Sequence, residues 1–170
     1  LNFKKGFIIE NQLNIDINNK NEIKGLFVSS GSFNKEKNHL KLIKEFTSLS
    51  SSFNLEIYGD IHNKKYFEYL QKYIMENDIK NVKLLTFDEN YYNRLKEAEY
   101  FCLYSNSEGC SYSILEAISL NKKIICSKNV LTTDFMRNYE NISYEFELFN
   151  KKISKNKFVL NSSIYSFLEL

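Results

Sequence analysis

The sequence contains no proline and only three cysteines, and both shortages restrict what the chain can be. Without proline, neither a rigid proline turn nor a cis prolyl bond can shape the fold. Cys102, Cys110 and Cys126 are odd in number and lack the close spacing of metal ligands, which favours free thiols in a reducing compartment over a disulfide framework. We therefore expect a cytoplasmic protein.

Long apolar runs and a strong excess of one charge are absent too. No apolar run approaches the roughly 20 residues of a membrane-spanning helix. The net charge is +2 and the lysines are scattered, so the sequence offers no basic face for nucleic acid. We expect no nucleic-acid partner, and membrane association only through a longer protein.

What is present suits a single domain over residues 1–170. The hydrophobic fraction is 43% and the charged fraction is 26%, both ordinary for a globular protein. A chain of 170 residues is long enough to bury a hydrophobic core. It starts at Leu1, with no Met and no leader, so we expect a piece of a longer product whose amino-terminal domain is missing.

Short apolar runs alternate with segments of helical periodicity along most of the chain. An extended segment is expected over 7–16, and residues 156–170 are ambiguous. Strands that alternate with helices indicate right-handed βαβ units and a parallel sheet covered on both faces, so the fold class is α/β. The expected strands are 23–29, 55–58, 82–87, 100–104, 123–126 and 142–146, and the expected helices are 38–49, 64–77, 91–97, 113–120 and 132–138.

The most informative motif lies between the fourth expected strand and the helix after it. Glu108 and Glu116 are separated by seven residues around a turn of small residues that opens this helix. In a parallel sheet, ligands bind outside the carboxyl ends of the strands, and the first N–H groups of a helix attract phosphate. Backbone donors at Cys110, Ser111 and Tyr112 suit a diphosphate, and the two carboxylates suit sugar or ribose hydroxyls. The motif therefore favours a sugar nucleotide.

Each of these residues also has a simpler explanation. Glutamates near a helix start are stabilised by the helix dipole whether or not a ligand binds. We interpret His39 as a surface residue at the start of a helix, and Cys110 as a packing residue because no histidine can be placed beside it. Four tyrosines could stack on a base, but aromatic residues are mostly core, and we expect the same here of Tyr91, Tyr92, Tyr100 and Tyr104.

Five landmarks in one order resemble the carboxyl-terminal domain of retaining glycosyltransferases of family four, which have the two-domain GT-B architecture. Glu108 and Glu116, with Gly109 after the first acid, match the family's Glu, seven residues, Glu signature. Lys37 aligns with the family's diphosphate lysine in a loop similar to its Gly-Arg and Glu-Lys-Asn segment. The other landmarks are the strand ending in Gly-Asp over 55–60, the base-contacting strand over 82–87, and the interdomain segment over 11–14.

The resemblance implies a Rossmann-like three-layer α/β/α domain with a parallel sheet of about six strands, one half of a GT-B enzyme. It implies retaining transfer from a nucleoside diphosphate sugar to a glycan or lipid acceptor, of a bacterial surface type, at the inner face of the membrane in the full-length protein. Glu108 and Lys37 would be catalytic. The donor-binding residues would be Ser32, Lys37, Thr86, Phe87, Gly109, Cys110, Ser111, Tyr112 and Glu116.

No cofactor and no metal are expected, because the sequence has no Asp-x-Asp pair of the kind that metal-dependent glycosyltransferases use. The acceptor would bind to the missing amino-terminal domain, so we expect the isolated fragment to be inactive.

The sequence departs from the family at the diphosphate loop, where Ser32 stands in place of arginine and Lys35 is the nearest replacement cation. The segment 109–111 also stands where the family has Gly-Phe-Gly, and the segment 121–123 stands where it has Gly-x-Pro. Two alternatives therefore stay open. One is a nucleotide- or sugar-binding module without activity. The other is a flavodoxin-like or receiver-type regulatory domain, although Asp60 alone does not provide the acidic cluster that such a domain needs.

Overall fold

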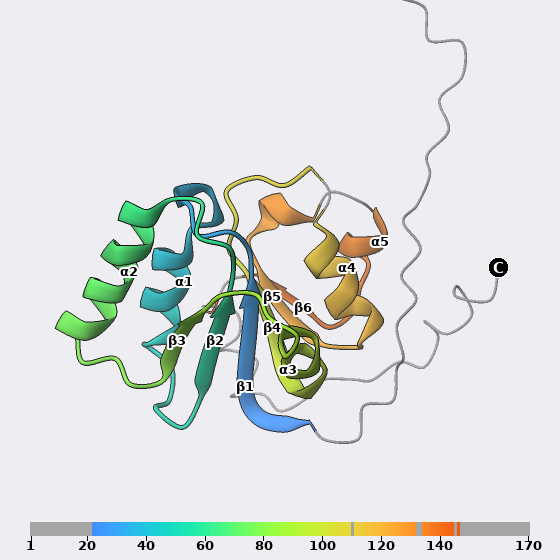
Figure 1. The fold of residues 1–170 in the computed structure, drawn as a ribbon. Coiled ribbons are helices and arrows are strands. Elements are labelled where there is room, and N and C mark those ends of the chain that lie inside the picture. The colour runs from blue at the N-terminus through green and yellow to red at the C-terminus, as the bar shows by residue number, and fades with distance from the viewer. Residues whose placement is uncertain (1–21, 110, 132–133, 145, 147–170) are drawn as a thin grey trace, which may run out of the picture.

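The computed structural model describes residues 22–109, 111–131, 134–144 and 146 (Figure 1). The expected segments over 7–16 and 156–170, and the landmark over 11–14, lie outside them. Six parallel strands form one sheet in the order β3-β2-β1-β4-β5-β6. The strands are β1 (Ile23–Ser30), β2 (Asn54–Tyr58), β3 (Val82–Leu85), β4 (Ala98–Leu103), β5 (Lys123–Cys126) and β6 (Ile142–Tyr144).

Helices cover both faces of the sheet, which confirms the predicted three-layer α/β/α architecture (Figure 1). On one face lie α1 (His39–Phe46) and α2 (Lys64–Glu76), and on the other lie α3 (Tyr91–Glu97), α4 (Tyr112–Ser119) and α5 (Asp134–Arg137). Because successive side chains of a strand point to opposite faces, neighbouring residues of β1 enter different cores. Phe27 packs in the cluster beneath α1 and α2, and Val28 in the cluster beneath α3 and α4.

The central strand β4 is buried at all six positions, as expected for a parallel strand covered on both sides. It begins at Ala98, two residues before the predicted start. The third strand, β3, ends at Leu85, two residues before its predicted end, so Thr86 and Phe87 belong to the loop that follows. The first predicted helix is shorter than expected, and two 3₁₀ turns, η1 (Lys35–Lys37) and η2 (Lys128–Val130), were not predicted.

The strand order reverses between β1 and β4. Strand β1 is hydrogen-bonded to β2 on one side and to β4 on the other, so the loops after β1 and β4 leave the sheet in opposite directions and open a crevice. This is the doubly wound order 3-2-1-4-5-6, whereas flavodoxin-like and receiver-type domains have the order 2-1-3-4-5. The regulatory-domain alternative is therefore excluded.

Two glycines allow the loops at this edge to approach each other. A Cβ atom on Gly59 would lie 2.1 Å from the backbone oxygen of Gly31, far closer than any real contact. The same loops are joined by a hydrogen bond of 2.9 Å from the Gly31 N–H to the Tyr58 carbonyl. The Gly-Asp segment directly after β2 therefore positions the loop that follows β1.

Candidate functional site

A cavity of about 400 Å³ opens at the carboxyl ends of β1 and β4, at the point where the strand order reverses. Ligands of doubly wound folds bind at this point. The cavity wall comes from the loops after β1, β3 and β4 and from the first turns of α3 and α4. Its lining residues are Ser30, Gly31, Lys37, Phe87, Tyr91, Glu108, Ser111, Tyr112, Ser113 and Glu116.

Six of the predicted site residues lie together in this wall: Lys37, Phe87, Glu108, Ser111, Tyr112 and Glu116. Their binding roles stay predictions. Of the other predicted residues, Ser32, Thr86 and Gly109 are not among the lining residues, and Cys110 lies outside the described residues. The Ser32 hydroxyl instead accepts a hydrogen bond of 2.9 Å from Asn34. Lys35, the proposed replacement for the arginine, is exposed and does not line the cavity.

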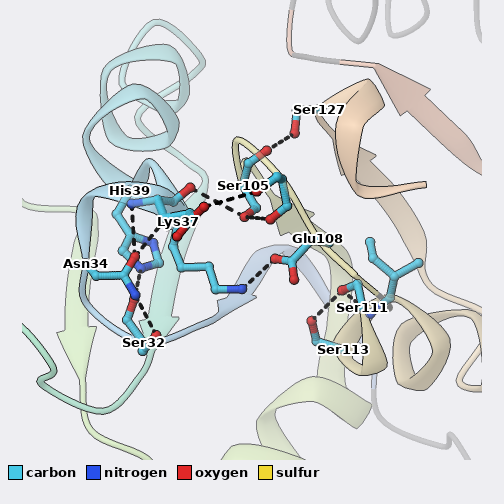
Figure 2. Close-up of polar contacts among 12 residues, drawn as sticks. Ser32, Asn34, Lys37, His39, Ser105, Glu108, Ser111, Ser113 and Ser127 are labelled. Atoms are coloured by element: carbon cyan, nitrogen blue, oxygen red, sulfur yellow. Dashed lines mark hydrogen bonds and ion pairs between the residues drawn. The ribbon is translucent and has the colours of Figure 1, made fainter. Parts of the chain in front are cut away.

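Lys37 is presented by the η1 turn, which Asn34 caps. The Asn34 side-chain oxygen accepts hydrogen bonds from the backbone N–H groups of Glu36 at 3.0 Å and Lys37 at 3.1 Å. Side-chain caps of this kind satisfy the first N–H groups of a turn and fix where it begins. The Lys37 ammonium then reaches across the crevice to the Glu108 carboxylate, 2.5 Å away (Figure 2). Their side chains are 23% and 12% exposed, so this pair is largely shielded from water.

The loop that carries Glu108 is fixed on both sides by hydrogen bonds. Its Asn106 N–H donates to the Glu36 carbonyl at 2.8 Å, and its Ser107 hydroxyl donates to the Glu36 carboxylate at 3.0 Å. On the other side, the Ser127 hydroxyl donates to the Ser105 carbonyl at 2.6 Å (Figure 2). The distance between Lys37 and Glu108 is thus set by the surrounding loops.

Helix α4 begins at the cavity. Ser111 is its N-cap and accepts a hydrogen bond from the Ile114 N–H at 3.4 Å, and its hydroxyl lies 3.2 Å from that of Ser113 (Figure 2). The first N–H groups of an α-helix have no acceptor within the helix and carry its positive dipole end. The backbone at Tyr112 and Ser113 therefore offers donors suited to an anion.

Another part of the cavity wall combines a carboxylate with two aromatic rings. The Tyr91 hydroxyl donates to Glu116 at 3.5 Å. Burial raises the pKa of the Glu116 carboxyl, and the hydrogen bond from Tyr91 opposes that shift. Phe87 is 40% exposed, and its ring meets that of Tyr91 edge to face at 5.0 Å. This part of the wall can accept hydroxyl hydrogen bonds and can contact a flat apolar group.

Sequence reasoning missed four lining residues: Ser30, Gly31, Ser113 and Tyr91. Ser30 and Gly31 directly follow the first expected strand, which ends at residue 29. Tyr91 was interpreted as core, and its position at the start of the helix after β3 was the available signal, since that helix begins at the ligand edge of the sheet. The core interpretation is confirmed for Tyr100 and Tyr104, which are buried.

The interpretation of His39 as a surface residue is wrong. The side chain is 1% exposed, and its Nε2 atom lies 3.2 Å from the Ser32 carbonyl (Figure 2). Its ring contacts that of Phe33 at 5.2 Å. Burial lowers the pKa of His39 to about 4. The loop over 31–37 folds back across the start of α1 and covers the imidazole, which sequence periodicity does not reveal. His39 therefore supports the loop that presents Lys37.

Within the described residues, no three side chains of histidine, cysteine, aspartate or glutamate are grouped so that they could hold a metal ion. In the same part of the chain, no helix combines the length and apolar character needed to cross a bilayer.

Residues 10–155 match the family model described as glycosyl transferases group 1. The chain belongs to this family. It is 31% identical over 100 residues to an N-acetylgalactosamine-N,N'-diacetylbacillosaminyl-diphospho-undecaprenol 4-alpha-N-acetylgalactosaminyltransferase of Campylobacter jejuni, a match that covers 59% of this chain and 27% of that protein.

Solved glycosyltransferase structures share the fold. HepE of Anabaena in complex with UDP aligns with a TM-score of 0.66 at 16% identity, over 82% of this chain and 41% of that one. The carboxyl-terminal domain of the group 1 glycosyl transferase LpcC of Francisella tularensis aligns with a TM-score of 0.63 at 14% identity, over 80% of this chain and 76% of that one. The fold is thus one Rossmann-like half of the GT-B architecture. The chain spans less than a third of the length of the curated relative that it matches.

Proposed function

We propose that this group 1 glycosyltransferase chain is a donor-binding domain that holds a nucleoside diphosphate sugar for retaining transfer to a glycan or lipid acceptor. One observation carries the proposal: Lys37, the amino end of α4, and Glu116 line a single cavity at the switch point of the sheet. These three features offer a cation, phosphate-binding N–H groups, and an acceptor for ribose hydroxyls.

The residues that line the cavity suggest how the donor would be oriented in it. The diphosphate would lie between Lys37 and the backbone N–H groups of Tyr112 and Ser113. The ribose would bond to Glu116, and the base would contact Phe87 and Tyr91 beyond it. Glu108, at the other side of Lys37, would accept hydrogen bonds from the sugar.

Charge stabilisation on the leaving group would be the main catalytic task. When the bond between the anomeric carbon and the diphosphate oxygen breaks, its electron pair stays on the diphosphate. Lys37 and the α4 N–H groups are fixed donors aimed at that charge, and fixed donors in a shielded site stabilise a transition state strongly. The acceptor hydroxyl then forms the new glycosidic bond on the same face of the sugar, and its proton passes to the departing diphosphate. The proposal requires no metal ion and no other cofactor.

The acceptor would bind to a further domain of a longer protein, so we expect the 170-residue chain to bind donor and transfer little by itself. The name of the Campylobacter relative states that it acts on a diphospho-undecaprenol-linked sugar. By analogy, we propose a cytoplasmic enzyme whose full-length form works on a bacterial surface glycan or glycolipid at the inner face of the membrane.

Two observations favour the second candidate function, binding without transfer. The arginine expected in the diphosphate loop is Ser32 here, and Lys37 is paired with Glu108. A charge-assisted hydrogen bond contributes about 1.5 to 3 kcal/mol, so the loss of the arginine reduces donor affinity by about one to two powers of ten unless the rest of the site compensates.

Calorimetric titration of uridine, guanosine and adenosine diphosphates into the chain tests the proposal. We expect at least one of them to bind, and Lys37→Met to weaken it about tenfold or more. Lys35→Met is the matched control, because Lys35 lies in the same 3₁₀ turn but outside the cavity wall. If none of the three binds, or if both variants weaken binding equally, the proposed diphosphate site is wrong.

Transfer is tested separately with a full-length protein that contains this chain. Release of nucleoside diphosphate from a nucleotide sugar, by transfer or by slow hydrolysis, supports the enzyme. Binding without any such release leaves the non-catalytic module as the function.

A further inference from the structure

We infer that Tyr91 is a positioning residue that orients Glu116 toward the ribose and so gives the site a preference for ribose over 2′-deoxyribose. The inference rests on the proposed function, since it assigns the ribose to Glu116.

The position of Tyr91 is fixed by the elements around it. It is the first residue of α3, and its backbone N–H donates to the Asp88 carbonyl at 3.2 Å. Its ring contacts that of Tyr58 at 5.3 Å and that of Phe87 at 5.0 Å. Aromatic pairs at these distances restrain each other. The hydroxyl at the end of this restrained ring therefore has a defined place.

That place is beside one oxygen of the Glu116 carboxylate. The Tyr91 hydroxyl lies 3.5 Å from Oε2, and both residues line the cavity. A carboxylate has two oxygens that can together accept several hydrogen bonds. The hydrogen bond from Tyr91 to Oε2 fixes the plane of the carboxylate. The remaining lone pairs of its two oxygens can then accept hydrogen bonds from two neighbouring hydroxyls. A ribose presents such a pair, whereas a 2′-deoxyribose presents one hydroxyl.

Ring packing alone does not explain why residue 91 is a tyrosine and not a phenylalanine. The contacts with Tyr58 and Phe87 are made by the ring and would persist with phenylalanine. Glu116 is partly buried on α4, and burial raises the pKa of its carboxyl. A partly buried carboxylate benefits from a fixed donor, because each unmade hydrogen bond in such a site costs free energy. Tyr91→Phe therefore removes the donor while keeping the packing.

The test compares ribose and 2′-deoxyribose forms of the same diphosphates. Uridine, guanosine and adenosine diphosphates and their 2′-deoxy forms are titrated into the wild-type chain, and the pair that binds is carried to the variants. We expect the wild type to favour the ribose form about tenfold, and Tyr91→Phe to reduce this ratio at least threefold while the 2′-deoxy form binds as before.

Tyr69→Phe is the matched control. Tyr69 lies on α2, is 49% exposed and does not line the cavity. This variant should leave the ratio unchanged. Glu116→Gln should lower the ratio and serves as the reference for a lost ribose contact.

The outcomes separate the inference from the function on which it rests. If wild type discriminates and Glu116→Gln abolishes discrimination but Tyr91→Phe does not, the inference alone is wrong. If Tyr91→Phe weakens both sugar forms equally, the Tyr91 hydroxyl does not act through the ribose contact and the inference is also wrong. If wild type binds no diphosphate, or binds both forms equally, the ribose assignment itself fails and the inference fails with it.

Discussion

The ammonium of Lys37 lies 2.5 Å from a carboxylate oxygen of Glu108, although the two residues are 71 positions apart in the sequence. Among the described residues that line the cavity, Lys37 is the only cation. A diphosphate that binds here must therefore compete with Glu108 for Lys37. Glu108 is the anion paired with Lys37.

Glu108→Gln should therefore strengthen the binding of a free nucleoside diphosphate. The change releases Lys37 and removes a negative charge next to the incoming phosphates, an effect of about 1 kcal/mol or about fivefold in affinity. Calorimetry on the chain measures it. Glu68→Gln, on the exposed face of α2, is the control with the same change of charge. Unchanged or weaker binding in Glu108→Gln would contradict this account of the pair.

His39 predicts a loss of stability in mild acid. The pKa of His39 is about 4 in the folded chain, against an ordinary value of 6.5 that we take for the unfolded chain. Between these values the unfolded chain binds a proton that the folded chain does not. The contribution is therefore fully present above about pH 6.5 and is lost as the pH falls toward 4, by up to about 3 kcal/mol.

Denaturant unfolding of wild type and His39→Gln at a series of pH values checks this prediction. Glutamine can still donate to the Ser32 carbonyl but does not titrate. We expect the difference in unfolding free energy between the two proteins to change between pH 6.5 and 4. A constant difference across that range would mean that the buried imidazole is not the cause.

Gly59→Ala should destabilise the chain by about 1 to 3 kcal/mol, because its Cβ would lie 2.1 Å from the Gly31 backbone oxygen. It should also weaken diphosphate binding, since Gly31 lines the cavity. Gly109→Ala is the control for stability, because a Cβ there meets no atom within 4 Å among the described residues. Thermal and denaturant unfolding of the two variants decide the point; equal stability would show that the two loops can separate at little cost.

Asp78→Gly should stabilise the chain by about 0.5 to 1 kcal/mol. Asp78 follows α2 with a φ of 50°, and the Ile79 N–H bonds back to the Ile74 carbonyl, a helix ending in which glycine is favoured at this position. Asp78→Ala is the control, because it removes the same ion pair with Lys80 without relieving the backbone. Equal unfolding midpoints for the glycine and alanine variants would rule out backbone strain as the reason.

The sequence allowed the sheet and its helices to be predicted because apolar periodicity records burial. It also allowed the ligand edge to be predicted, because Glu108 and Lys37 each follow a strand. It could not reveal η1, since a turn of three residues has no periodicity. It could not reveal the burial of His39 or the Lys37–Glu108 pair, because both arise where loops distant in sequence fold over each other. For Tyr91, composition favoured the core, against which it does pack, and only the start of α3 at the ligand edge indicates that it also lines the cavity.

The most direct test of the central claim is a crystal structure of the chain with the nucleoside diphosphate that binds it. We predict the diphosphate within hydrogen-bonding distance of the Lys37 ammonium and the backbone N–H groups of Tyr112 and Ser113, with the ribose on Glu116. A diphosphate bound at another edge of the sheet, or one that leaves Lys37 paired with Glu108 and untouched, would contradict the account.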